Sequence, residues 1–304
     1  MSTRRWPYPD LRNGTTIHHL TDTHFGAQDF VNTWLEQTRL HLTRLRATNA
    51  GHVHTGDMIH NYFNTTAADD AAYVSWRTAL KAAEPGKPYA EAVGNHDLGR
   101  YIDGAPVLRT TDQWEAAVGV PDKNSVTTMG AVKVITVGPD SWPWPDNSQS
   151  VLTAATLSWL DAQLTAAGST PCWIAAHAPL REQYPAQTAG SVQQPEASLD
   201  AVLGAHDNVI GWLSGHLHSP VTDTTNVAAV TVAGKRLFTV NGPAAGGGRI
   251  ASVPYAEHQF RSPNHSALVT YLGDAVDVRW LDHNRWQWAN DSSGGHYRHT
   301  LLRS

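Results

Sequence analysis

The stretch Tyr89-Ala90-Glu91-Ala92-Val93-Gly94-Asn95-His96-Asp97 decides how the rest of the chain is interpreted. A short apolar segment typical of a strand ends at a glycine, and an amide, an imidazole and a carboxylate follow in consecutive positions. Alone, this tetrapeptide is typical of an ordinary polar turn. It becomes informative because matching polar pieces lie on both sides of it in the chain: Asp22-Thr23-His24 and Gly56-Asp57 before it, and His177 and Gly215-His216-Leu217-His218 after it.

The polar pieces in the first third of the chain each follow a predicted strand. We expect strands at residues 15–21, 52–55 and 89–93, separated by amphipathic helices at 31–47 and 67–83. This alternation, with a polar loop at the carboxyl end of each strand, is typical of an α/β layered fold. Ligands of such folds bind at the carboxyl edge of the sheet.

The rest of the chain continues the alternation and then becomes extended. Apolar strands are predicted at 172–176 and 209–214, and they end just before His177 and the stretch from Gly215 to His218. The remaining expectations are a hairpin at 125–137, helices at 112–118, 153–167 and 199–205, and antiparallel strands at 227–232, 236–240, 267–271 and 275–280 that complete a second sheet.

Among the segments without a predicted helix or strand are both ends of the chain and a polar stretch near residue 190. We expect residues 1–13 to form an irregular arm and residues 181–196 a mobile surface loop or lid, and residues 286–304 are an unassigned tail. The chain has no internal repeat and no linker, and we therefore predict a single domain over residues 1–304.

The composition excludes several classes of protein. Hydrophobic residues make up 41% and charged residues 16% of the 304 positions, which is typical of a globular chain with a sizeable core. The net charge of -5 indicates no dedicated nucleic-acid-binding surface. Cys172 is the single cysteine, so the fold needs no oxidising compartment. No apolar run approaches the ~18 residues of a membrane span, and Arg4-Arg5 lacks the apolar core of a signal peptide. We expect a cytoplasmic protein without a membrane partner.

The polar pieces together supply one set of metal-binding side chains. If the predicted strands lie side by side, their loops converge on one edge and bring together seven donors: Asp22, His24, Asp57, Asn95, His177, His216 and His218. Nitrogen and oxygen donors without a thiolate suit zinc, iron or manganese better than calcium. Two metals with four protein ligands each would share one of the seven, and a carboxylate has the two oxygens that a bridge needs. Asp57 is the candidate. Two metals ~3.5–4 Å apart can hold a bridging hydroxide and clamp the oxygens of a phosphoryl displacement.

The five pieces resemble, in order and from residue 15 to about residue 242, the five motif blocks of the calcineurin-like metallophosphoesterases. The resemblance implies a four-layer α/β/β/α sandwich with two mixed sheets and a dimetal site at the carboxyl ends of the strands. It implies one metal on Asp22, His24, Asp57 and His218, and the other on Asp57, Asn95, His177 and His216. In this pattern His96 faces the substrate as a catalytic residue, and Asp97 orients the His96 imidazole.

Other conspicuous side chains have plainer interpretations. We expect solvated or packing roles for His18, His19, His52, His54 and His60, although His60, Asn61 and Asn241 are also candidates to line the pocket. For Trp142 and Trp144 we favour packing over stacking on a nucleobase.

The resemblance leaves the substrate open. Purple acid phosphatases have a tyrosine ligand at the position of His60, and serine/threonine protein phosphatases have an arginine at the position of Asp97, so both branches are disfavoured. The chain is similar to bacterial cyclic-nucleotide and glycerophosphodiester phosphodiesterases. We therefore predict a hydrolase of a small, nucleotide-like phosphodiester. The alternatives are a broad phosphomonoesterase and a non-catalytic scaffold, and the oligomeric state stays open.

Overall fold

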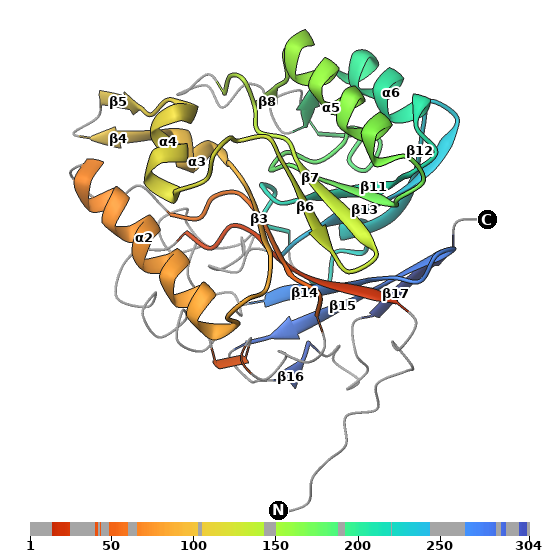
Figure 1. Ribbon diagram of the computed structural model, residues 1–304, viewed down its shortest axis with the longest axis horizontal. Helices are drawn as coiled ribbons and strands as arrows, with labels where there is room; N and C mark the ends of the chain where they lie inside the picture. Colours follow the sequence, from red (N-terminus) through yellow and green to blue (C-terminus); the bar gives the residue numbers. More distant parts are fainter. Residues whose placement is uncertain are drawn as a thin grey trace, which may run out of the picture.

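Two stacked sheets of mixed direction, with helices on both outer sides, carry the described part of the chain in this computed structural model (Figure 1). The structure describes residues 14–24, 40–41, 43, 49–59, 66–102, 105–142, 150–187, 192–219, 221–243, 265–283, 287–289 and 298–302. The expected irregular arm at 1–13 and most of the helix predicted at 31–47 lie outside these residues. Within the latter, Leu40, His41 and Thr43 are helical.

The first sheet is built around the three strands that precede the early polar pieces. Strands β1 (Thr15–Leu20), β2 (His52–Thr55) and β3 (Tyr89–Ala92) run parallel. On the other side of β1 follow the antiparallel strands β14 (His265–Tyr271) and β15 (Ala275–Asp282), and β15 pairs with both β16 (Gln287–Trp288) and β17 (Arg298–Leu302). The carboxyl ends of β1, β2 and β3 therefore share one edge.

The second sheet has the order β12-β13-β11-β9-β7-β6. Its strands are β6 (Ser125–Met129), β7 (Val132–Thr136), β9 (Cys172–Ala175), β11 (Val209–Ser214), β12 (Val227–Val232) and β13 (Lys235–Asn241). Strands β7, β9, β11 and β13 are parallel, and β6 and β12 flank them antiparallel. Two smaller pairs are β4 (Gly99–Ile102) with β5 (Ala105–Leu108), and β8 (Ser150–Val151) with β10 (Gln193–Gln194).

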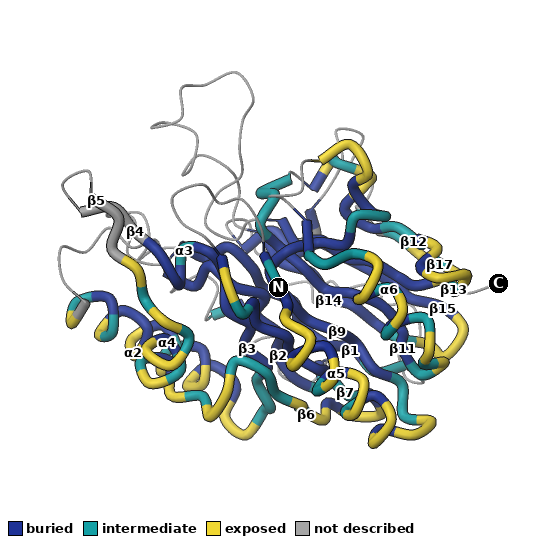
Figure 2. The backbone as a smooth tube through the Cα atoms, turned by 90° about the horizontal axis from the view of Figure 1, so that it is seen from above, coloured by how far each residue is buried: buried dark blue, intermediate teal, exposed yellow. Residues whose placement is uncertain are grey.

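Three apolar clusters hold four layers together. Ile17 and Val53 of the first sheet pack with Trp173 and Phe238 of the second, so this cluster lies between the sheets. Helices α2 (Thr66–Ala83) and α4 (Thr111–Val118) cover the outer face of the first sheet through a second cluster, while α5 (Ala154–Ala167) and α6 (Glu196–Ala205) cover the second sheet through a third. Figure 2 shows the buried sheets in dark blue and the exposed outer sides of the helices in yellow. The predicted α/β/β/α layering is confirmed.

The late strands do not all complete the second sheet, as the sequence predicted. Strands β12 and β13 do join it, but β14 and β15 return to the first sheet, where β14 pairs with β1. This pairing covers the free edge of β1, and the distance along the chain between the two strands leaves no local signal for it. The tail also contributes β16 and β17, which the sequence left unassigned, and the β4–β5 hairpin was not predicted.

The segment predicted as a mobile loop at 181–196 is anchored in its described part. Gln183 Nε2 donates to the Thr225 carbonyl at 2.9 Å, and the Tyr184 hydroxyl donates to Asn226 Oδ1 at 3.0 Å. Gln193 lies in β10 and is buried. Across the described residues, no helix combines the length and apolar character that a membrane span requires.

Candidate metal centre

The seven predicted ligands lie at the carboxyl ends of five strands. Asp22 and His24 follow β1, Asp57 follows β2, Asn95 follows β3, His177 follows β9, and His216 and His218 follow β11. The first three strands belong to one sheet and the last two to the other, so the site lies where the carboxyl edges of the stacked sheets meet. The prediction that the ligands converge is met, but across two sheets and not along one edge.

A first donor set comprises Asp22, His24, Asp57 and His218, with one ligand atom from each lying within 4.8 Å of all the others. His218 Nε2 lies 3.0 Å from both Asp22 Oδ1 and His24 Nε2. His24 Nε2 is 3.8 Å from Asp57 Oδ2 and 4.0 Å from Asp22 Oδ1. Two atoms that ligate one ion at ~2.1 Å lie about 3.0–3.4 Å apart when adjacent and up to about 4.2 Å apart when opposite, so these spacings fit a single metal.

A second donor set comprises Asp57, Asn95, His177 and His216. Asn95 Oδ1 lies 3.1 Å from His177 Nε2 and 3.1 Å from His216 Nδ1. His177 Nε2 is also 3.3 Å from Asp57 Oδ2. Asp57 Oδ2 therefore lies near a histidine of each set, 3.8 Å from His24 Nε2 and 3.3 Å from His177 Nε2. This is the geometry expected of a carboxylate shared by two ions.

The tautomer of His177 favours ligation. Its Nδ1 lies 2.6 Å from the Thr55 carbonyl oxygen, which can only accept, so Nδ1 carries the hydrogen and donates it. In the neutral imidazole, Nε2 then carries the lone pair, and a cation held between Nε2, Asn95 Oδ1 and Asp57 Oδ2 would accept it. A carbonyl partner of this kind is the usual device that fixes the ring of a metal-binding histidine.

The charges of the centre fit a cation. Burial acts to lower the pKa of His177, but Asp57 and Asp22 outweigh it and raise the pKa to about 9. Burial lowers the pKa of His216 to about 3, assisted by the neighbouring His177 charge. Burial would raise the pKa of Asp57, yet His177 and His96 hold it well below its usual value. The site therefore keeps carboxylates ionised beside a proton on His177 that a metal can displace.

The backbone at the ligands adopts a conformation that side chains seldom tolerate. Six non-glycine residues in the described part have positive φ, and five are predicted ligands: Asp22, His24, Asp57, His216 and His218, with φ from 45° to 74°. The sixth is Ala233. Such left-handed residues are uncommon and concentrate at functional sites, where the surroundings hold them in place.

The glycines beside the ligands are required by close approach. A Cβ on Gly94 would lie 2.2 Å from Asp57 Oδ1, and a Cβ on Gly215 would lie 2.4 Å from Asp22 Oδ2. Gly56 has φ 93° and would bring a Cβ to 2.7 Å from His177 Nδ1. These positions have no room for a side chain, because the ligand loops pack against one another there.

The tetrapeptide Gly94-Asn95-His96-Asp97 is organised around Asp57. The His96 main-chain N–H donates to Asp57 Oδ1 at 2.9 Å, which leaves Oδ2 to face the histidines. Asp97 Oδ2 accepts from the main-chain N–H groups of Asp57 at 2.9 Å and Gly94 at 2.8 Å. Asp97 Oδ1 accepts from the Met58 N–H at 3.0 Å and the Tyr73 hydroxyl at 2.9 Å.

These contacts replace the role predicted for Asp97. Its carboxylate was expected to orient the His96 imidazole, but its four acceptor positions are taken by Asp57, Met58, Gly94 and Tyr73. Burial and the neighbouring Asp57 raise the pKa of Asp97 to about 7, against which the Gly94 N–H and the Tyr73 hydroxyl act. Asp97 thus holds the loop that carries Asp57.

His96 lies at the partly exposed rim of the site. Its ring packs edge-on against His24, with centroids 5.0 Å apart. Burial lowers the pKa of His96, and the charge of Asp57 opposes this effect. The imidazole is therefore next to the first donor set while its main chain supports Asp57.

Other singled-out side chains fall into place around the centre. His18, His19, His52 and His54 are buried, so the packing interpretation holds for them. His54 accepts from the Gly56 N–H at 3.2 Å, and this contact, which the sequence did not predict, supports the turn before Asp57. Trp142 is buried with its ring centroid 5.2 Å from His216 and 5.5 Å from His177, which confirms packing. Asn241 accepts from Ser214, and His60, Asn61 and Trp144 lie outside the described residues.

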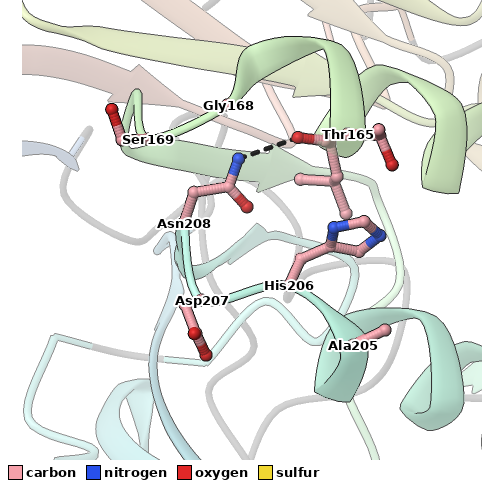
Figure 3. A pocket seen from close by; sticks show the side chains of 8 residues that line it. Thr165, Gly168, Ser169, Ala205, His206, Asp207 and Asn208 are labelled. Atoms are coloured by element: carbon pink, nitrogen blue, oxygen red, sulfur yellow. Dashed lines mark hydrogen bonds between the residues drawn. The ribbon is translucent and has the colours of Figure 1, made fainter.

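A surface pocket elsewhere is not part of this centre. It lies at the ends of α5 and α6 and is lined by Thr165, Gly168, Ser169, Ala205, His206, Asp207 and Asn208 (Figure 3). Ser169 precedes β9 and Asn208 precedes β11. The pocket is therefore at the amino ends of these strands, opposite the ligand edge.

Two stacked mixed sheets whose carboxyl ends present two donor sets with a shared carboxylate define a class of α/β proteins with a binuclear metal centre. The family comparison agrees. The model of the calcineurin-like phosphoesterases matches residues 15–220, and the chain belongs to this family. The matched range contains all seven predicted ligands and His96. No curated protein matches the chain in sequence.

Solved structures share the fold at low sequence identity. A dimetal phosphatase from Danio rerio is 13% identical, with the match covering 95% of this chain and 99% of that chain at a TM-score of 0.61. A purple acid phosphatase from yellow lupin (Lupinus luteus) seeds is 14% identical, covering 98% and 55% at a TM-score of 0.58. GAP50 of Plasmodium, described as the anchor in the inner membrane complex, is 12% identical, covering 96% and 89% at 0.53.

Proposed function

We propose that this protein is a dimetal-dependent phosphodiesterase that hydrolyses a small, nucleotide-like phosphodiester. The observation that carries the proposal is Asp57 Oδ2, which faces His177 at 3.3 Å and His24 at 3.8 Å and so joins the two donor sets. The donors are imidazole nitrogens, carboxylates and one amide oxygen, a set that fits manganese, iron or zinc. When bound, two such ions supply an activated water and neutralise charge developing on the phosphoryl group.

The chain's own residues account for the remaining steps. The Asp57 loop, held by Asp97 and the His96 main chain, fixes the shared carboxylate. We assign the His96 imidazole, at the rim beside His24, the task of protonating the leaving oxygen of the ester. Trp142 packs on the His177 and His216 rings and keeps that side of the site apolar.

The preference for a diester rests on charge. Asp97 places a third carboxylate behind Asp57, at the position where serine/threonine phosphatases have an arginine. A phosphodiester carries one negative charge and a phosphomonoester up to two, so the Asp97 carboxylate, whose pKa is raised to about 7, repels the diester less in the fraction of molecules in which it is ionised. Turnover of bis-p-nitrophenyl phosphate and p-nitrophenyl phosphate with added Mn²⁺ tests the preference. We expect faster turnover of the diester, and faster turnover of the monoester would favour the phosphomonoesterase.

A scaffold is the second candidate, because the fold is shared with a protein described as an anchor. The complete set of seven donors favours the enzyme. Absence of hydrolysis of both esters with Mn²⁺, Zn²⁺ and Fe²⁺, in protein shown to bind metal, would favour the scaffold.

A further inference from the structure

We infer that Tyr73 of helix α2 is a positioning residue for the shared carboxylate Asp57, acting through Asp97. The inference rests on the proposed function, since it assigns a residue to the metal centre that this function requires. Tyr73 lies 24 residues from Asp97 in the chain and belongs to none of the five motif blocks.

Asp97 has one side-chain donor in the described part of the structure. Three of its four hydrogen bonds come from the main-chain N–H groups of Asp57, Met58 and Gly94, and the fourth comes from the Tyr73 hydroxyl at 2.9 Å. The main-chain donors belong to the two ligand loops themselves. The Tyr73 hydroxyl is therefore the contact that ties these loops to a helix outside the site.

The Tyr73 ring is itself held in place. Its side chain is 1% exposed, and the Arg109 guanidinium lies over the ring, 5.3 Å from the centroid. Arg109 is anchored in turn by Asp70 at 2.7 Å. A buried phenol with a guanidinium over its ring can direct its hydroxyl to one place, which is what a positioning residue must do.

Loss of the hydroxyl has a specific consequence for the centre. Asp97 Oδ1 would keep the Met58 N–H but lose its other donor, in a site that water does not reach. A buried carboxylate that lacks a donor can rotate, and the main chain of the Asp57 loop, which donates to it, can move with it. Asp57 would then shift relative to both donor sets at once. We therefore expect weaker binding of both metals, and not a general loss of folding.

Tyr89 supplies a matched control. Its hydroxyl also contacts helix α2, donating to the Leu80 carbonyl at 2.7 Å, but it touches neither Asp97 nor a predicted ligand. Tyr73→Phe and Tyr89→Phe thus each remove one hydroxyl hydrogen bond that involves α2. A difference between the two variants in metal affinity measures the role of Tyr73 in the centre.

The first experiment is Mn²⁺ titration of metal-free wild type and both variants by calorimetry, with metal analysis after gel filtration. We expect two ions in the wild type, an affinity about tenfold lower in Tyr73→Phe, and wild-type affinity in Tyr89→Phe. With subsaturating Mn²⁺, kcat for the diester should fall in Tyr73→Phe with little change in KM, and excess Mn²⁺ should restore part of it. Equal affinities in Tyr73→Phe and wild type would overturn the inference, whereas a wild type that binds no metal would overturn the proposed function.

A double-mutant cycle with Asp97→Asn tests the route through Asp97. An amide at position 97 can no longer accept four hydrogen bonds, so the link from Tyr73 to the Asp57 loop is already broken in this variant. We expect Tyr73→Phe to lower Mn²⁺ affinity much less in the Asp97→Asn background than in the wild type. Additive losses would contradict action through Asp97.

Thermal melts with and without Mn²⁺ separate positioning from folding. A positioning role predicts that Tyr73→Phe folds and shows a smaller metal-induced rise in Tm than wild type, while Tyr89→Phe shows the full rise. A Tyr73→Phe chain that stays unfolded even with Mn²⁺ would assign the hydroxyl to folding and overturn the inference.

Discussion

His18 Nδ1 lies 3.1 Å from His52 Nδ1, at paired positions of the parallel strands β1 and β2. Both rings are buried on the face of the first sheet opposite Ile17 and Val53, away from the core between the sheets. The chain of contacts continues on both sides. His18 Nε2 bonds Ser266 Oγ at 2.6 Å, Ser266 Oγ bonds His283 Nε2 at 2.7 Å, His283 Nδ1 bonds His41 Nδ1 at 2.9 Å, and His52 Nε2 contacts Glu84.

Hydrogen counting shows that neutral imidazoles can satisfy every contact of this buried histidine network. If Glu84 is ionised, His52 donates to it from Nε2. Each remaining contact then has one neutral donor: His18 Nδ1 donates to His52 Nδ1, the Ser266 hydroxyl donates to His18 Nε2, His283 Nε2 donates to Ser266 Oγ, and His41 Nδ1 donates to His283 Nδ1. All five contacts are satisfied with four neutral imidazoles. Burial, reinforced by the repulsion that the neighbouring histidines exert when they are protonated, holds the pKa values of His18 and His283 well below their usual range.

This buried histidine network predicts that acid destabilises the fold. Because the folded pKa values of His18 and His283 are depressed, their stabilising effect is complete above the unfolded value near 6.5 and is lost as the pH falls below it. Each group should lower the free energy of unfolding by roughly 1.4 kcal/mol per pH unit in that range. Urea unfolding between pH 7.5 and 5 should show the decline.

A histidine substitution isolates the effect of this network on the pH dependence of stability. We expect His18→Gln to be less stable than wild type at pH 7.5 and to lose less stability on acidification. His206→Gln, which changes a histidine outside this network at the end of α6, is the control for the loss of a histidine elsewhere. Parallel profiles for His18→Gln and wild type would show that His18 does not titrate in this way.

His96→Ala separates the imidazole from the main chain at the same position. The N–H that supports Asp57 is retained in alanine, so we expect both metals to bind as in wild type. Loss of a proton donor for the leaving oxygen should lower kcat for the diester roughly 10²–10⁴-fold. Hydrolysis at the wild-type rate in metal-loaded His96→Ala would remove His96 from the mechanism.

Asp57 and His218 should differ in how many ions they affect. Asp57→Asn changes the residue that belongs to both donor sets, and we expect the affinity for both ions to fall by more than about 100-fold. This loss exceeds the one usual for a residue that only hydrogen-bonds to a metal ligand. His218→Ala removes a member of the first set only and should leave one ion bound. Metal analysis after reconstitution with Mn²⁺ gives the two stoichiometries. Fewer than two ions in the wild type would contradict the shared carboxylate.

Gly94→Ala tests the close approach of the two ligand loops. The new Cβ would lie 2.2 Å from Asp57 Oδ1 and 2.3 Å from the Asp57 nitrogen, so the loops must separate. We expect a loss of roughly 1–3 kcal/mol in stability together with weaker metal binding. Gly86→Ala is the control, because Gly86 has φ 80° and open space around it. It should cost about 1–2 kcal/mol through backbone strain alone and bind Mn²⁺ normally.

The amino-acid sequence alone predicted the layer order and named the residues that the structure brings together in the two donor sets. Each ligand directly follows an apolar strand segment, and the residue type at that position is what metal chemistry requires. These are local relationships, legible over a few residues such as Gly94 to Asp97. The same locality explains why most helices and strands were predicted close to their observed bounds.

Contacts between distant segments became visible only in the three-dimensional fold. Asp97 was assigned to its neighbour His96, but its partners include Tyr73 on another element and the main chain of the Asp57 loop. Ser266 lies 248 residues from His18, and β14 had no local sign that it would pair with β1 and not with the second sheet. Hydrogen bonds of this kind depend on which surfaces the stacked sheets bring together. Strand and helix periodicity carries no record of that pairing, because it reports only which face of a segment is buried.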